Sequence, residues 1–224
     1  MTAVLDDIRS KIETFPGSYR FLYGPAATLE SPYIFVGLNP GGTADDPSDL
    51  SVEQGHAFLH EKWAGDKINA LQNQVQSLFR KMATHLHVAE WTTFMTYRWL
   101  VSNYVFYRSK RWQTMATKKA HVENCKAIWR SQFTRVPPKV IICNAYETYA
   151  EMKRLLVELG WAQESERLSE RAWDGPHTAV MVKEERYCLL VGFAHLSTFK
   201  VVNRLENRAA MEATYGRIRD HWVL

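Results

Sequence analysis

The stretch Tyr33-Ile34-Phe35-Val36-Gly37-Leu38-Asn39-Pro40-Gly41-Gly42 places an apolar run directly before an amide, a proline and two glycines. The apolar residues predict a buried β-strand that delivers Asn39 to its carboxyl end. Pro40 restricts one backbone angle, and Gly41 and Gly42 allow a ligand to approach the main chain closely. The same residue types are also common in ordinary turns, because Asn and Gly tolerate left-handed conformations. The stretch therefore indicates either a turn or a binding site at a strand end.

The chain as a whole has the composition of a globular protein. Its 224 residues are 46% hydrophobic and 12% aromatic, which is enough for a sizeable core, and we expect one domain over residues 1–224. Cys125, Cys143 and Cys188 are far apart, and this odd, unpaired set argues against a disulfide framework or a structural zinc. The N-terminal residues lack the pattern of a signal peptide, and no apolar run approaches the roughly 20 residues of a membrane helix. We therefore expect a cytoplasmic protein that does not enter a membrane.

Helical and strand patterns alternate along the chain. The spacing predicts helices over 4–12, 68–82, 118–133 and 146–159, and strands over 33–37, 100–106, 139–143, 178–182 and 187–191. A last helix is predicted to begin near Thr198, with one apolar face formed by Val202, Leu205, Ala209, Tyr215, Ile218 and Trp222. This alternation predicts a three-layer α/β/α sandwich with a mainly parallel central sheet, whose binding crevice opens at the carboxyl ends of the strands.

Polar side chains interrupt three of the apolar runs. Asn39 ends the first, Asn103 lies in the run that starts at Leu100, and His195 follows the run that ends at Ala194. A buried amide or imidazole is costly unless it has hydrogen-bond partners. Taken singly, Asn39 can be a turn residue, Asn103 an edge-strand side chain facing water and His195 a helix cap. Their occurrence together favours a common site.

The order of these segments resembles a known family. Gly37-Leu38-Asn39-Pro40-Gly41 resembles the first motif of the uracil-DNA glycosylase superfamily, especially the mismatch-specific and single-strand-selective branches, which have Asn where others have Asp. Ser102-Asn103-Tyr104-Val105 and the following Arg108-Ser109 resemble the strand whose Asn reads the base. His195-Leu196-Ser197 resembles the closing His-Pro-Ser motif, with Leu196 in place of the proline. The resemblance extends from about Tyr33 to about Lys200.

The resemblance implies a uracil-DNA glycosylase-like fold and a monofunctional DNA glycosylase. Such an enzyme flips a pyrimidine nucleotide out of DNA and hydrolyses its N-glycosidic bond, which leaves an abasic site. Asn39 is expected to orient the attacking water, since an amide does not ionise usefully, and His195 to donate to the departing base, where negative charge develops. Phe58 is either a stacking ring or ordinary loop packing. The expected base-binding residues are Gly37, Leu38, Pro40, Gly41, Gly42, Phe58 and Asn103.

Basic residues are concentrated between Arg108 and Arg135, where eight of them accompany one acid, Glu123. The concentration indicates either a solvated helix face or a phosphate-binding surface. With the resemblance, we expect DNA as the partner, and Leu196 or Phe199 as the residue that wedges into the base stack. The expected DNA contacts are Arg108, Ser109, Lys110, Arg111, Leu196, Ser197, Thr198, Phe199 and Lys200.

The identity of the base stays open. Gly41 and Gly42 occupy the stretch in which some relatives carry a tyrosine that blocks C5 of the ring. Uracil and C5-enlarged pyrimidines, such as the glucosylated hydroxymethylcytosine of phage DNA, are therefore both possible substrates. The superfamily includes, as the resemblance implies, bacterial enzymes that remove this modified base in defence against phage. A noncatalytic base-reading module and a small-molecule nucleoside hydrolase are the alternatives.

The other histidines do not predict a metal site. His56 and His60 have helical spacing, and His85 and His87 alternate as in a strand, but no third ligand accompanies either pair. We expect no metal, no other cofactor, no obligate protein partner and a monomer.

Overall fold

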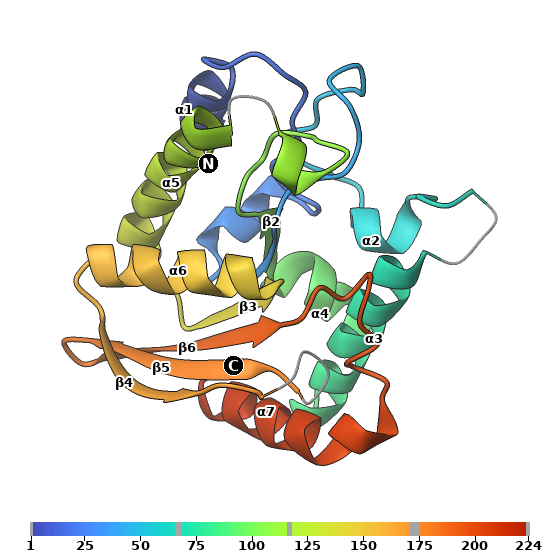
Figure 1. Ribbon diagram of the computed structural model, residues 1–224, viewed down its shortest axis with the longest axis vertical. Coiled ribbons are helices and arrows are strands. Elements are labelled where there is room, and N and C mark those ends of the chain that lie inside the picture. Colours follow the sequence, from blue (N-terminus) through green and yellow to red (C-terminus); the bar gives the residue numbers. More distant parts are fainter. Residues whose placement is uncertain (1, 66–68, 116–117, 171–174, 223–224) are drawn as a thin grey trace.

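The centre of the protein is a six-stranded sheet, shown by a computed structural model that describes residues 2–65, 69–115, 118–170 and 175–222 (Figure 1). The order across the sheet is β2-β1-β3-β6-β5-β4. The first four strands are parallel, and β5 runs antiparallel between β6 and β4. The prediction of a mainly parallel sheet is confirmed. The strands are β1 (Tyr33–Gly37), β2 (Leu100–Asn103), β3 (Val140–Asn144), β4 (Ala162–Arg167), β5 (His177–Lys183) and β6 (Arg186–Phe193).

Helices cover both faces of this sheet (Figure 1). One layer contains α1 (Thr2–Ile12), α5 (Lys118–Arg135) and α6 (Tyr146–Glu158), and the other contains α3 (Ala70–His85), α4 (Trp91–Arg98) and α7 (Arg208–Asp220). The alternation of strand side chains separates the two cores, since in β1 Ile34 and Val36 join the first and Tyr33 and Phe35 the second. The three-layer sandwich is confirmed. The short elements are α2 (Ala57–His60) and the 3₁₀ turns η1 (Ala26–Glu30), η2 (Trp112–Thr114) and η3 (Leu205–Asn207).

Two predicted elements differ at their ends. The strand predicted over 100–106 ends at Asn103, because from Tyr104 the chain crosses the end of β1 and Tyr104 N–H donates to the Gly37 carbonyl over 2.7 Å. The helix predicted from Ile68 begins at Ala70, where the side chain of Asn69 accepts from two backbone N–H groups as its cap. Ile68 itself lies outside the described residues.

The prediction for the last helix was wrong at its start. The helix α7 begins at Arg208, ten residues after Thr198, and Leu205 is 84% exposed. The intervening loop binds Gln74 of α3, whose side chain donates to the Leu196 and Phe199 carbonyls and accepts from Val202 N–H. These bonds satisfy backbone groups that a helix would otherwise pair internally.

The three cysteines are buried and unpaired. Within the described ranges, no helix combines the length and apolar character that crossing a membrane requires.

Candidate active site

A cleft of about 980 Å³ opens at the carboxyl ends of the parallel strands. Its lining includes Gly37 at the end of β1, Asn103 at the end of β2 and Asn144 at the end of β3, together with His195 just after β6. Asn39, Asn103 and His195, which the sequence singled out at separate strand ends, therefore line one space. The predicted residues in the lining are Gly37, Leu38, Asn39, Pro40, Gly41, Gly42, Phe58, Asn103, Arg108, Ser109, Lys110, Arg111, His195, Ser197 and Thr198.

The amide of Asn39 is held in one orientation. Its Nδ2 donates to the Pro40 carbonyl over 3.0 Å and to the Ser109 carbonyl over 3.4 Å. Since carbonyl oxygens only accept, these bonds identify the nitrogen side of the amide and leave Oδ1 as the acceptor that is available to a ligand or water. The Ser109 backbone N–H also donates to the Pro40 carbonyl over 3.1 Å, so the segment after β2 holds this loop in place.

Asn103 is buried at the end of β2, where it pairs in register with Gly37 of β1. Its Nδ2 donates to the Tyr23 hydroxyl over 2.7 Å, and its Oδ1 accepts no hydrogen bond from the described residues. A Cβ at position 37 would lie 2.2 Å from Asn103 Oδ1, so only glycine leaves room for this side chain. Burial raises the pKa of Tyr23 above its usual value, while the bond from Asn103 acts in the opposite direction. Tyr23 is therefore a neutral phenol that orients Asn103.

Aromatic rings form one wall of the cleft. Phe58 is 4% exposed and lies with its ring centroid 5.1 Å from that of Tyr23 and 4.7 Å from that of Trp63. All three rings contribute to the cleft lining. Phe58 thus packs against neighbouring rings and also lines the cleft, and its role as a stacking ring stays a prediction. The cleft therefore has an aromatic surface on this side.

His195 presents a hydrogen-bond donor. Its Nδ1 lies 2.6 Å from Ser197 Oγ and accepts weakly from the Ser197 backbone N–H over 3.4 Å. Because a backbone N–H only donates, the proton of the neutral ring belongs on Nε2. Burial lowers the pKa of His195 from its usual value, while the charge of Glu147 acts in the opposite direction. The ring is therefore neutral near pH 7.

Asn144 supports the His195 loop from the neighbouring strand. Its Oδ1 accepts from the Leu196 backbone N–H over 2.8 Å, and it is followed by Ala145, whose φ of 135° is unusual for a residue with a side chain. The single residue between β3 and α6 is thus strained beside the cleft, a feature that often accompanies function. Sequence reasoning missed Asn144. The signal that singled out Asn39, an asparagine at the end of an apolar run, is also present here, because Asn144 ends the buried run of β3.

Two arginines and two carboxylates form a network of ion pairs that is bonded to the loop after β1. Asp49 Oδ2 lies 2.7 Å from Arg20 Nη2 and 2.9 Å from Arg108 Nη2, and Glu61 Oε2 lies 2.7 Å from Arg20 Nη1. Arg108 also donates to the Gly41 carbonyl over 3.1 Å, and Trp63 Nε1 donates to Glu61 over 2.6 Å. The network therefore holds the backbone of the first loop and one edge of the aromatic wall.

This network changes the expected role of Arg108. Its side chain is only 11% exposed and its guanidinium is occupied by Asp49 and Gly41, so it positions the loop rather than offering a free charge to DNA. Lys110 and Arg111 are exposed at the cleft rim.

Some of the other basic residues between Arg108 and Arg135 also form ion pairs within the protein. Lys126 and Arg130 pair with Glu158, and Arg135 pairs with Glu30. These residues of α5 stabilise contacts with neighbouring elements, which accounts for part of the basic run without DNA.

The closing loop also corrects the expected wedge. Leu196 is fully buried in the core, so its side chain is not presented to DNA. Phe199 is half-buried against the same core, and Lys200 is exposed but does not line the cleft. Ser197 and Thr198 are exposed at the rim.

The histidines outside the cleft have structural contacts. His56 caps α2, and His85 Nε2 lies 2.8 Å from Glu212 Oε2. In the part of the chain that the structure describes, no group of three or more His, Cys, Asp or Glu side chains is arranged to hold a metal ion.

Comparison with known proteins adds one finding to this geometry. A family model described as the uracil DNA glycosylase superfamily matches residues 25–218. That range contains all six strands of the sheet and the loops that carry Asn39, Asn103 and His195. No curated protein matched the chain. The family match covers most of the sequence, and the chain therefore belongs to the uracil-DNA glycosylase superfamily.

Proposed function

We propose that this protein is a monofunctional DNA glycosylase that hydrolyses the N-glycosidic bond of a pyrimidine nucleotide extruded from DNA. Membership of the superfamily supports a function of the DNA glycosylase type. The observation that carries the proposal is the convergence of Asn39, Asn103 and His195 on one cleft lined by aromatic rings.

Binding begins with extrusion of the nucleotide, which costs a few kcal/mol of stacking and pairing. Stacking of the base on the Phe58 wall returns about 1–3 kcal/mol. The Oδ1 of Asn103 then accepts a hydrogen bond from the base, since its Nδ2 is held by Tyr23. This arrangement reads a ring N–H or an exocyclic amino group, either of which a pyrimidine edge provides.

Bond cleavage places negative charge on the departing base. Nε2–H of His195 is the donor that stabilises this charge at a carbonyl oxygen, and a neutral ring is sufficient for that role. Oδ1 of Asn39 accepts from a water and directs it at the sugar carbon. Asn39 positions this water and does not take its proton as a general base would.

The base is proposed to be uracil or a C5-enlarged pyrimidine. A Cβ at Gly41 would meet no atom within 4 Å, so the space beside the first loop is open. The cleft volume of about 980 Å³ leaves room beyond a single pyrimidine ring. Asp49 and Glu61 each direct one oxygen into ion pairs and line the same cleft, where carboxylates can accept from hydroxyl groups of a substituent.

Abasic-site formation tests the proposal directly. Duplexes that contain uracil, 5-hydroxymethylcytosine or its glucosylated form are incubated with the protein, and strand breaks are measured after alkali treatment. The Asn39→Ala variant is expected to release base at least 100-fold more slowly while binding DNA with little change, because Asn39 acts only on the attacking water.

Asn73→Ala, an exposed amide on α3, is the matched control and is expected to behave as the parent protein. Absence of abasic product from all three duplexes would refute the glycosylase, and equal rates for Asn39→Ala and the parent would refute the role of Asn39. A protein–DNA adduct trapped by borohydride would contradict monofunctional chemistry.

A further inference from the structure

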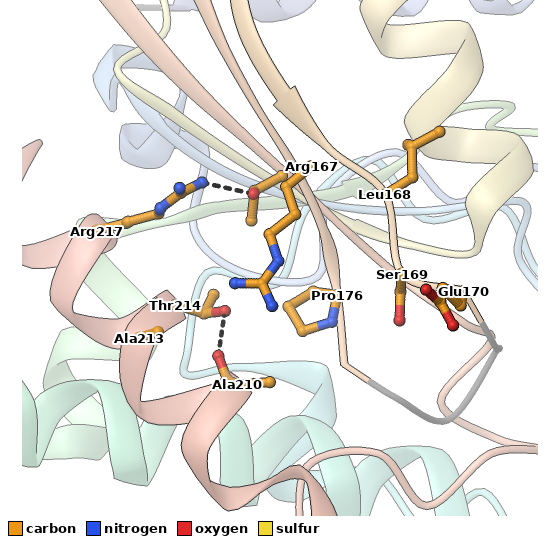
Figure 2. A pocket seen from close by; sticks show the side chains of 10 residues that line it. Arg167, Leu168, Ser169, Glu170, Pro176, Ala210, Ala213, Thr214 and Arg217 are labelled. Carbon is orange, nitrogen blue, oxygen red and sulfur yellow. Dashed lines mark hydrogen bonds between the residues drawn. The ribbon is translucent and has the colours of Figure 1, made fainter.

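A second, smaller hollow of about 280 Å³ lies between the end of β4, the start of β5 and helix α7 (Figure 2). Two arginines reach into it from opposite sides. Arg167 extends from the end of β4 toward α7, and Arg217 extends from α7 toward the strands (Figure 2). The lining residues are Arg167, Leu168, Ser169, Glu170, Pro176, Thr178, Ala210, Ala213, Thr214 and Arg217.

Neither arginine has an anionic partner among the described residues. Arg167 forms no ion pair or side-chain hydrogen bond there, and Arg217 only donates to Thr178 Oγ1 over 2.6 Å. Glu170 lines the same hollow but lies beyond ion-pair distance of both guanidinium groups. By contrast, Arg20, Arg108, Arg130 and Arg135 all pair with carboxylates. Two like charges that face one hollow repel each other, and a bound anion removes that cost.

The hollow is built by close packing of α7 on the segment before β5. Gly175 has a φ of +122°, and a Cβ there would lie 2.9 Å from that of Ala210. Thr178 and Thr214 are buried beneath the two arginines, and Thr178 orients Arg217 through its hydroxyl. Arg217 is exposed, and this hydrogen bond directs its guanidinium along the hollow.

The hollow and the active-site cleft share one edge of the sheet. Arg167 pairs in register with Thr178, and Thr178 pairs with Val191 of β6, which leads to His195. Two strand spacings separate β4 from β6, or about 10 Å, and four separate β4 from β1, which leads to Asn39, or about 19 Å. The Tyr146 ring, just after the cleft residue Asn144, stacks on His177 at 3.8 Å, and His177 Nδ1 accepts from Ser169 N–H of the hollow. These contacts connect residues at the hollow with the residues that follow Asn144 at the cleft.

We propose that Arg167 and Arg217 bind a backbone phosphate of the DNA strand that flanks the extruded nucleotide. This inference rests on the proposed glycosylase function. Guanidinium groups match phosphate oxygens with paired N–H donors, which distinguishes them from the point charge of lysine. At about 3.4 Å per nucleotide of a stacked strand, these separations place the bound phosphate about three to six nucleotides from the extruded base.

Removal of both charges tests this site. The double variant Arg167→Gln/Arg217→Gln is expected to bind a 25-base-pair substrate duplex about tenfold more weakly. The slope of log K against log salt concentration is expected to fall by about 1, the value for one lost phosphate contact. The loss belongs to DNA binding, so it appears in KM rather than in the rate of base release at saturating DNA.

Arg154→Gln/Arg186→Gln is the matched control, because it removes two exposed charges outside the hollow. Thermal unfolding checks that both double variants fold. Equal affinities and salt slopes for the two double variants would overturn the phosphate site while leaving the glycosylase in place. If the parent protein neither binds DNA nor releases base, the proposed function fails and this inference fails with it.

Shortened duplexes locate the contact. Stepwise trimming of the duplex to fewer than about six and then about three base pairs on one side of the target base is expected to abolish the affinity difference between the parent and Arg167→Gln/Arg217→Gln, while trimming the other side leaves it. Titration with inorganic phosphate distinguishes the source of the anion. Loss of phosphate binding in the variant with no change in DNA affinity would assign the hollow to a free anion and overturn the DNA contact.

Discussion

At the scale of single residues, the cleft depends on glycines that leave space for neighbouring groups as much as on polar side chains that form hydrogen bonds. Gly37 has no strained backbone angle, yet a Cβ there would lie 2.2 Å from Asn103 Oδ1. Asn103 cannot easily retreat, because it is buried and bonded to Tyr23. Gly41 has the opposite surroundings, with open space where a side chain would extend. Gly37 therefore permits the buried position of Asn103, and Gly41 keeps the space beside the first loop open.

Gly37→Ala tests the first of these roles. The added methyl group displaces Asn103, so we expect base release to fall at least tenfold and the free energy of unfolding to fall by about 1–3 kcal/mol, as in other overpacked sites. Gly216→Ala is the control, since a Cβ there meets nothing within 4 Å and alanine favours the helix α7 by up to about 1 kcal/mol. An unchanged rate of base release by Gly37→Ala would contradict the assigned role of Asn103.

At the scale of secondary-structure elements, His56 shows how a short helix is held beside the cleft. Its Nδ1 accepts from Phe58 N–H as the cap of α2, and its Nε2 is buried without a hydrogen-bond partner in the described structure. Burial lowers the pKa of His56 to about 3, with a smaller contribution from His60. The folded protein therefore keeps this ring neutral, and the neutral ring positions Phe58.

The pH dependence of stability tests this cap. Below pH 6.5 the unfolded chain binds a proton at His56 that the folded chain does not bind until about pH 3, so folding loses up to about 1.4 kcal/mol per pH unit as the pH falls through this range. His56→Asn keeps a capping oxygen but does not titrate. We expect the stability advantage of the parent over this variant to shrink below pH 6.5 and to be constant above it.

Urea unfolding at pH 5, 6, 7 and 8 measures this difference. His87→Asn is the matched control, because it makes the same substitution at an exposed histidine whose φ of 55° asparagine accepts readily. Parallel stability profiles for the parent and His56→Asn would show that His56 protonates equally in the folded and unfolded chains.

Element prediction succeeded where one local pattern decided the structure. The strand β1 matches its predicted range of 33–37, and α6 ends within one residue of its prediction. The strand β4 was not predicted, because most of its residues are exposed and polar and show no alternation. The helix α4 was also missed, because it is short and its buried residues are consecutive and do not have the spacing of one helix face. Both form because neighbouring elements supply the pairing or the packing surface.

At the scale of the whole molecule, the C-terminal segment closes the core at the edge of the sheet opposite to the cleft. The ring centroid of Trp222 lies 4.1 Å from that of Tyr33, at the beginning of β1. The Trp222 ring is also stacked with that of Trp99 and meets that of Phe94 edge to face. Trp222 therefore packs against the beginning of β1. This contact stabilises the sheet without touching the residues that line the cleft.

Trp222→Ala separates stability from activity. Loss of a half-buried indole from this aromatic cluster is expected to lower the free energy of unfolding by about 2–4 kcal/mol. Base release measured well below the unfolding temperature is expected to stay within twofold of the parent. Leu205→Ala, at a side chain that is 84% exposed, should change stability by less than about 0.5 kcal/mol. Equal stabilities of the two variants would show that the C-terminal contact carries little energy.

The sequence by itself determined the sandwich and the three polar strand ends, because alternation, helical spacing and an interrupted apolar run are local properties. Only the tertiary structure decided that Leu196 is buried, that Arg108 is occupied by Asp49, and that Tyr23 orients Asn103. Those outcomes depend on partners 52 to 122 positions away, such as Gln74 of α3 and Asn144 of β3, which bind the loop that contains Leu196. A side chain can bind DNA or the protein's own backbone with the same atoms, and the partner that folding brings near decides which.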